Sequence, residues 1–145
     1  MSYGWSLEDL EFYYGSSAGS RYDVSTPEGV ERYSRVKEWL KMAIELLGLR
    51  LDPSTRVLVL FAGSCMEGLA LAELYGVKPV CLDLQERLLR KGLEKAKELG
   101  VEVEVVAGDA RRAHELLKGR VFDVALAWGI SLPHIDLWGF EEVCK

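Results

Sequence analysis

The stretch Val57-Leu58-Val59-Leu60-Phe61-Ala62-Gly63-Ser64-Cys65-Met66-Glu67-Gly68 decides how this chain folds. Residues 57–61 form an unbroken apolar run of strand-forming side chains, which is typical of a strand buried on both faces. Gly63 then interrupts the run, and apolar residues over 68–75 follow until Gly76 ends the pattern. The stretch therefore predicts a buried strand, a glycine turn and a short helix.

The same alternation extends in both directions from this stretch. Before it, Thr26 and Pro27 are a capping residue and a first helical residue, and apolar residues recur at helical spacing up to Gly48. The expected elements are helices over 27–47, 68–75, 86–99 and 109–117, and strands over 57–61, 79–83, 101–105 and 122–128. A further helix begins within 131–145. Strands that alternate with helices predict an α/β fold, a parallel sheet with right-handed crossovers and helices on both faces.

Composition limits the kind of protein. A length of 145 residues suits one domain. We divide it into an aromatic N-terminal segment over 1–25, which either covers a ligand as a lid or covers the core, and a domain over 26–145. The net charge of −5 argues against a nucleic-acid-binding surface. No apolar run is long enough to cross a bilayer, and no signal peptide is present, so we expect a cytoplasmic protein without a membrane partner.

Three cysteines occur, and they are too few and too scattered for a disulfide framework. No CxxC pair indicates a zinc site, and we expect no metal. We therefore expect Cys65, Cys81 and Cys144 to be free thiols, most of them buried.

Three segments are expected to meet at the carboxyl edge of the sheet, where α/β proteins bind ligands. The turn over 61–68 offers close backbone approach at Gly63 and the free N–H groups of a helix start. Asp83 ends the second strand, 83 − 63 = 20 residues after Gly63, where an acid accepts hydrogen bonds from ribose hydroxyls. Asp109 follows the third strand. Each residue also has a structural interpretation, the glycine as a turn residue and the acids as helix N-caps.

Together these features resemble class I S-adenosylmethionine-dependent methyltransferases from Arg56 to Trp128. The resemblance implies a Rossmann-like sheet of order 3-2-1-4, without the last three strands of the family fold, and S-adenosylmethionine as cofactor, with S-adenosylhomocysteine as product. It implies that the turn holds the methionine part, Asp83 the ribose, and Asp109 with Ala110 the adenine. The expected cofactor-binding residues are Phe61, Ala62, Gly63, Ser64, Cys65, Gly68, Asp83, Leu84, Gly108, Asp109, Ala110 and Trp128, the last of these near the methyl group.

Two departures from the family pattern are visible. The family usually has an acid in the first strand and a second glycine after Gly63, and this chain has Val59 and Cys65. We expect the Cys65 side chain to lie where the methionine tail of the cofactor would lie, which would weaken binding. Cys65 is either a nucleophile activated by the helix start or a bystander.

The methyl acceptor is expected to be a small molecule or a protein. The Asn/Asp-Pro-Pro-aromatic motif of many base-modifying methyltransferases is absent after the fourth strand, where residues 128–134 read WGISLPH. His134 is a candidate general base or a surface loop residue, and no other catalytic residue is evident. Because the fourth strand would lie at an open edge, we expect this form to be a truncated or split product that pairs with a second copy or with a C-terminal partner chain.

Two other functions use the same topology. A nicotinamide-dependent oxidoreductase would require a GxGxxG turn, whereas the next glycine after Gly63 is Gly68. A non-catalytic module that binds an adenosyl ligand would fit the changes at Val59 and Cys65.

Overall fold

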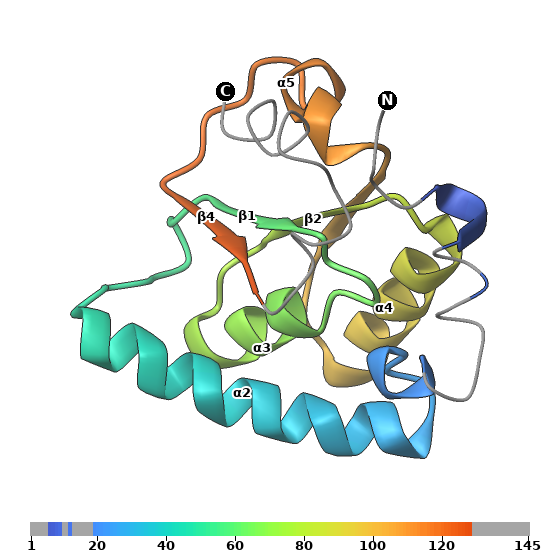
Figure 1. Ribbon diagram of the computed structural model, residues 1–145. Coiled ribbons are helices and arrows are strands. Elements are labelled where there is room, and N and C mark those ends of the chain that lie inside the picture. Colours follow the sequence, from blue (N-terminus) through green and yellow to red (C-terminus); the bar gives the residue numbers. More distant parts are fainter. Residues whose placement is uncertain (1–5, 10–11, 13–18, 129–145) are drawn as a thin grey trace.

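A four-stranded parallel sheet of order β3-β2-β1-β4 forms the centre of the computed structural model, which describes residues 6–9, 12 and 19–128 (Figure 1). The elements are η1 (Ser20–Tyr22), α2 (Pro27–Leu47), β1 (Val57–Leu60), α3 (Met66–Tyr75), β2 (Val80–Asp83), α4 (Glu86–Leu99), β3 (Glu104–Ala107), η2 (Ala110–Arg112), α5 (Ala113–Leu116) and β4 (Val124–Ala127). The predicted α/β class, parallel pairing and strand order are confirmed.

The longest helix, α2, begins and ends where its sequence signals predict. The Thr26 hydroxyl accepts a hydrogen bond from the backbone N–H of Gly29 at 3.0 Å, and Pro27 needs no such partner in the first turn. Gly48 ends the helix in the left-handed region at φ 66°. Residues next to the helix in the sequence therefore fix both of its ends.

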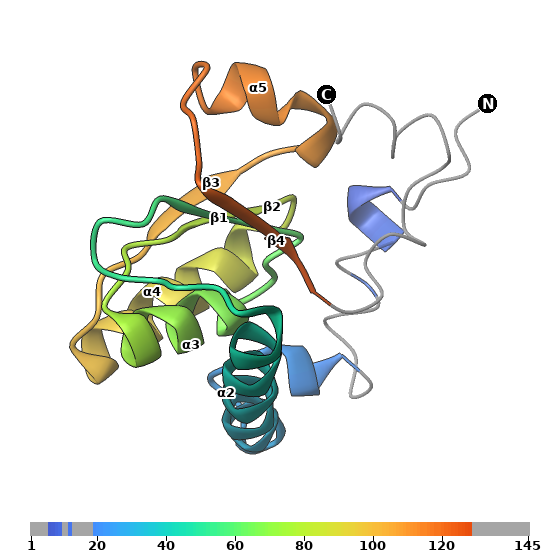
Figure 2. The ribbon, with the colours of Figure 1, turned by 90° about the vertical axis from the view of Figure 1, so that its left-hand side faces the viewer.

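Helices cover the two faces of the sheet unequally, with α2, α3 and α4 on one side and α5 on the other (Figure 2). Alternate strand residues divide between two apolar clusters. Val57, Val59 and Cys81 join the larger cluster under α2 and α3, whereas Leu58 and Leu82 join the smaller cluster beneath α5. This alternation shows why the strands are apolar without a break, since both faces are buried.

The strand register brings all carboxyl ends to one edge of the sheet. Leu60 of β1 pairs with Leu82 of β2 and with Ala127 of β4, and Asp83 pairs with Ala107 of β3. The turns that follow β1, β2 and β3 therefore leave the sheet side by side.

The third strand begins later than predicted. Val101 and Val103 pack against the larger cluster as the alternation indicated, yet β3 starts only at Glu104. The backbone N–H of Glu104 donates to the carbonyl of Pro79 at 2.9 Å, and proline has no N–H with which to continue the ladder in the other direction.

The helix predicted over 109–117 is divided into η2 and the four-residue α5. The Asp109 carboxylate accepts a hydrogen bond from the N–H of Arg111, only two residues on, and this tight turn starts a 3₁₀ helix. Leu116 folds back onto Gly108, where a Cβ would lie 2.4 Å from its Cδ1 atom. The segment is therefore too strongly curved for one regular helix.

No helix in the described ranges combines the length and apolarity needed to span a bilayer. His134, Cys144 and the helix expected within 131–145 lie outside the described residues, as do Tyr13 and Tyr14 of the predicted lid segment.

Candidate functional site

Three backbone turns converge on Asp83 at the carboxyl edge of the sheet. One carboxylate oxygen of Asp83 accepts a hydrogen bond from the N–H of Gly63 at 2.9 Å, and the other accepts from the N–H of Gln85 at 2.8 Å. The carbonyl of Asp83 accepts from the N–H of Gly108, also at 2.9 Å. The sequence therefore correctly places Gly63, Asp83 and the start of the third turn together, and Asp83 does not cap α4, whose N-cap residue is Gln85.

The turn after β1 takes its shape from three alternate residues in the left-handed region. These are Phe61 at φ 54°, Gly63 at 56° and Cys65 at 65°. Among the described residues, none has an atom within 4 Å of a Cβ built on Gly63, so this part of the structure leaves open space beside the turn. A ligand can approach the backbone there, as Gly63 was predicted to allow.

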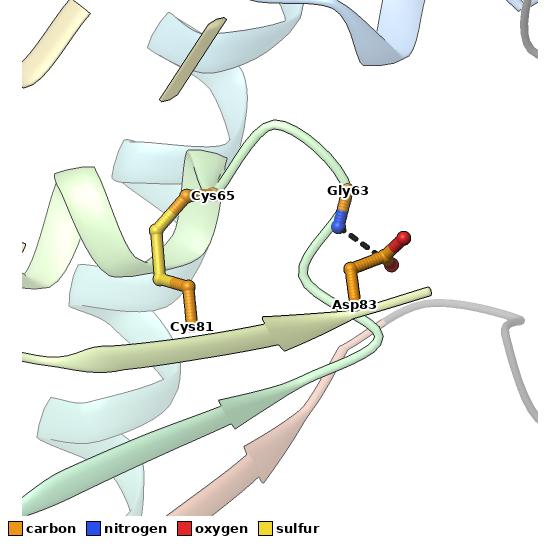
Figure 3. The surroundings of a disulfide bond; sticks show 4 residues. All are labelled: Gly63, Cys65, Cys81 and Asp83. Carbon is orange, nitrogen blue, oxygen red and sulfur yellow. Dashed lines mark hydrogen bonds between the residues drawn. A yellow bond between two sulfur atoms is a disulfide. The ribbon is translucent and has the colours of Figure 1, made fainter. Parts of the chain in front are cut away.

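Cys65 and Cys81 are joined by a disulfide, and the expectation that both are free thiols is wrong (Figure 3). The sequence gives the two residues 16 positions apart, but the fold brings their Cα atoms to 5.9 Å, within reach of a disulfide. Both side chains are fully buried beneath the turn. Cys65 therefore does not occupy the space beside Gly63, and the expected obstruction of a methionine tail is also wrong, as is a nucleophilic role for this bonded sulfur.

Gly68 packs against both sulfur atoms. A Cβ there would lie 2.5 Å from the Cys81 sulfur and 2.7 Å from the Cys65 sulfur. The glycine thus lets α3 lie close to β2, as the sequence predicted, although the contact is with the disulfide. Gly68 does not line the open space beside Gly63.

The carboxylate of Asp109 forms its contacts within its own turn. Its carboxylate forms an ion pair with Arg111 at 2.5 Å and also caps η2. The Arg111 guanidinium lowers the pKa of this carboxyl below its usual range, so the group is ionised at neutral pH. The neighbouring Ala110 is buried against the smaller cluster. Asp109 lies at the predicted edge, and its N-cap interpretation describes what the carboxylate does in the structure.

The remaining predicted residues surround the same edge in different ways. Trp128, directly after β4, packs against the larger cluster, whereas Phe61 packs against the smaller one on the opposite face. Leu84 is half-buried after β2, and Ala62 is buried. Ser64 is buried, and its hydroxyl donates to the Tyr22 carbonyl at 2.5 Å.

Sequence reasoning missed three polar residues close to this edge. Glu67 lies in the first turn of α3, inside the stretch that decides the fold, and a lone acid near a helix start was the available signal. Tyr22 and Arg32 come from the segment before β1, and Arg32 contacts the Tyr22 ring, its guanidinium carbon 4.7 Å from the ring centre. No pattern in the sequence pairs these two residues with the turn, since only tertiary packing brings them there.

Burial dominates the electrostatics of Glu67. Its pKa is raised to about 7, mainly by loss of hydration and to a smaller degree by the negative charge of Asp83, while a hydrogen bond from its own backbone N–H and the Arg32 guanidinium oppose the shift. The site therefore contains a carboxylate that changes charge near neutral pH beside one that anchors the turn.

No model of a protein family and no curated protein matches the sequence. Solved structures do match. The chain is similar to PH0226 from Pyrococcus horikoshii, with 25% identity and a TM-score of 0.62 over 92% of this chain and 53% of that one. It is also similar to YjhP from Escherichia coli, with 26% identity and a TM-score of 0.52 over 78% of this chain and 42% of that one.

A third similar structure is an S-adenosylmethionine-dependent methyltransferase from Thiobacillus denitrificans, solved with S-adenosyl-L-homocysteine. It is 24% identical, with a TM-score of 0.58 over 92% of this chain and 49% of that one. The chain has the fold of the class I S-adenosylmethionine-dependent methyltransferases. It spans about half the length of the solved chains that it matches, so it corresponds to one part of a methyltransferase fold.

Proposed function

We propose that this chain binds S-adenosylmethionine and serves as the cofactor-binding part of a methyltransferase whose acceptor is a small molecule or a protein. The observation that carries the proposal is the Asp83 carboxylate, held at the edge by the N–H groups of Gly63 and Gln85. An acid that ends the second strand of such a sheet accepts hydrogen bonds from ribose hydroxyls.

The residues at the edge fit such a ligand. Gly63 leaves space beside the backbone for the methionine part, and the turn over 108–110 lies next to Asp83, where an adenine would be held. The similar structure from Thiobacillus denitrificans contains S-adenosyl-L-homocysteine, which supports an adenosyl ligand here.

The chemistry asked of this chain is mainly positioning. S-adenosylmethionine, when bound, supplies a methyl group that its sulfonium already activates. The turn and Asp83 would fix the orientation of the ligand, and Trp128 would limit the space at the end of β4. Alignment of an acceptor with the methyl group then provides much of the rate enhancement.

Titration calorimetry with S-adenosylhomocysteine and NAD tests the proposal. We expect binding of S-adenosylhomocysteine, and no binding of NAD because the turn lacks the GxGxxG spacing. Binding of NAD alone would support the oxidoreductase alternative and contradict our proposal. Binding of S-adenosylhomocysteine without methyl transfer to any acceptor would support the non-catalytic module.

Asp83→Asn is the decisive variant, because it keeps the shape of the side chain and removes its charge. Hydrogen bonds to a charged group are worth about 1.5–3 kcal/mol, so the affinity for S-adenosylhomocysteine should fall by about tenfold or more.

Asp52→Asn is the matched control. Asp52 accepts from the N–H of Ser54 at 2.8 Å, the same local turn that Asp83 makes with Gln85, but it lies before β1 at the opposite edge. The Asp52→Asn protein should bind S-adenosylhomocysteine with the wild-type affinity. Equal losses in both variants would contradict the role of Asp83.

A further inference from the structure

A cavity of about 390 Å³ opens at the amino edge of the sheet, opposite to the edge that holds Asp83. Its lining comes from the segments that lead into β1, β2 and β4, together with the first residues of β1 and β2. Small-molecule sites have volumes of about 300–1,000 Å³, so this cavity can hold a small organic ligand. The proposed binding of S-adenosylmethionine makes no use of it.

One ion pair spans the strand ends beside the cavity. Arg120 lies in the segment that leads into β4, and its Nη1 atom is 2.8 Å from one carboxylate oxygen of Glu104 and 3.0 Å from the other. Glu104 is the first residue of β3, and β3 and β4 are the outer strands of the sheet. The pair therefore connects the two outer strands past the amino ends of the inner ones, where Val57 and Val80 line the cavity.

All charged side chains among the described lining residues are cationic, namely Arg56, Lys78 and Arg120. Each cation pairs with a carboxylate from outside the lining, and these partners are Asp123, Glu102 and Glu104, respectively. The three pairs are largely exposed to solvent, and such pairs contribute little to stability. An anionic ligand can therefore share the cations at little cost to the fold.

Arg120 keeps two donors for such a ligand. Both of its contacts with Glu104 use Nη1, and its Nε and Nη2 atoms form no hydrogen bond with any described residue. Nε and Nη2 together form one side of the planar guanidinium fork, which binds a carboxylate through two parallel hydrogen bonds. The guanidinium carbon lies 5.6 Å from the centre of the Phe122 ring, a contact that orients the fork without using its donors.

Apolar side chains complete the lining. Phe122 is half-buried against the smaller apolar cluster, which also contains Val80. Val121 between them in space is 68% exposed, so it leaves an apolar surface in contact with water. A ligand with a flat apolar body would remove that surface from water, which is favourable.

We infer that this cavity binds a small aromatic carboxylate. Arg120 would bind the carboxylate through Nε and Nη2, and Lys78 would add a further charged donor. The aromatic body would lie against Val121 and Phe122. The site is separate from the one at Asp83, and it does not depend on the proposed function.

Naphthoate and naphthamide are the probes, because they share a flat ring system and only naphthoate carries a charge. In titration calorimetry the wild type should bind naphthoate saturably and naphthamide about tenfold or more weakly, since hydrogen bonds to the charged group are lost. Excess S-adenosylhomocysteine should leave the affinity for naphthoate unchanged. The inference is overturned if naphthoate does not bind, if the two probes bind equally, or if S-adenosylhomocysteine displaces naphthoate.

Arg120→Met should reduce the affinity for naphthoate by about tenfold or more, and it should leave the affinity for naphthamide within about twofold. Lys78→Met is the second variant if the first does not fold. It should show a smaller selective loss, because a lysine does not bind a carboxylate through two parallel donors.

Arg90→Met is the matched control. Arg90 forms an exposed ion pair with Glu86 at 2.8 Å, the same distance as in the Arg120–Glu104 pair, but it lies in α4 and does not line the cavity. This variant should bind both probes with the wild-type affinities. Equal losses of the two probes at Arg120, no loss there, or the same selective loss at Arg90 would each overturn the inference.

Discussion

At Gly63 the backbone adopts φ 56°, flanked two residues away on each side by Phe61 and Cys65 in the same left-handed region. For residues with a Cβ this region costs roughly 1–2 kcal/mol each, so the turn accepts strain at two positions and avoids it at the central one. At Gly63 the absent side chain also leaves open space among the described residues.

Gly63→Ala tests whether this space serves a ligand. The unfolding free energy should fall by about 1 kcal/mol from backbone strain, and the affinity for S-adenosylhomocysteine should fall much further because the methyl group enters the binding space. Gly48→Ala is the control, since Gly48 has φ 66° and equally open surroundings at the end of α2. Denaturant unfolding and calorimetry would measure both quantities, and equal affinities in the two variants would contradict the placement of the ligand.

Cys65 shows where residue-level reasoning from the sequence ends. The pattern identified it as the position of a missing glycine, and the structure confirms that glycine-like conformation at φ 65°. Its side-chain direction could not be predicted, because that depends on whether Cys81 of the next strand lies beneath the turn. The Cys65 side chain therefore lies in the core, whereas we had expected it to lie in the ligand pocket.

At the scale of elements, a disulfide and a side-chain hydrogen bond both connect the turn after β1 to β2. The disulfide joins Cys65, just before α3, to Cys81, and two residues later Asp83 accepts the N–H of Gly63 (Figure 3). On the other side α4 lies so close that a Cβ on Gly92 would be 2.5 Å from the Ser64 carbonyl. The turn is therefore held from β2 and from α4 without any ligand.

Removal of the disulfide should lower stability measurably. A covalent link across 16 residues restricts the unfolded chain and is worth about 3 kcal/mol. Dithiothreitol treatment and the double variant Cys65→Ala/Cys81→Ala should each shift the unfolding midpoint to lower denaturant concentration. Cys144→Ala should keep the wild-type response to the reductant. Three free thiols in the untreated protein, counted by mass spectrometry after alkylation, would contradict the disulfide.

The elements with signals at both ends are those that the sequence predicts well. α2 has Thr26 and Gly48 as caps, and α4 ends at Gly100 as expected. β3 and the segment around α5 were predicted less well, because their limits depend on Pro79 in the neighbouring strand and on the short turn at Asp109. Local patterns locate an element, whereas its last residues are fixed by its partners.

For the whole molecule, the order of elements predicted the class of fold, and the resemblance predicted the strand order. Successive strand–helix units with right-handed crossovers indicate a parallel sheet, and the observed order β3-β2-β1-β4 is the one that the methyltransferase resemblance implies. The same reasoning brought Gly63 and Asp83 together. It could not bring Arg32 to them, because the path of the chain before β1 is not limited by any strand pairing. The Tyr22–Ser64 bond, which joins residues 42 apart in the sequence, is one of the contacts that fix this path.

Because Glu67 is costly to charge in the folded protein, the stability of the whole fold should depend on pH. A glutamate in the unfolded chain has the ordinary pKa of 4.5, and burial raises the pKa of Glu67 to about 7 in the folded protein. Below the unfolded value both states carry the proton, so Glu67 has no effect there. As pH rises toward 7 the unfolded state releases its proton first, and the folded state becomes less stable relative to it.

Glu67→Gln removes this penalty, so its gain in unfolding free energy over the wild type should be larger at about pH 8 than at about pH 5, by on the order of 2 kcal/mol. Glu102→Gln is the control. A hydrogen bond from Lys78 lowers the pKa of exposed Glu102 from 4.5, so that residue keeps its charge at both pH values and its substitution should have the same effect at each. Urea unfolding of the three proteins measures the difference, and a pH-independent Glu67→Gln effect would show that its carboxylate is not buried as the structure has it.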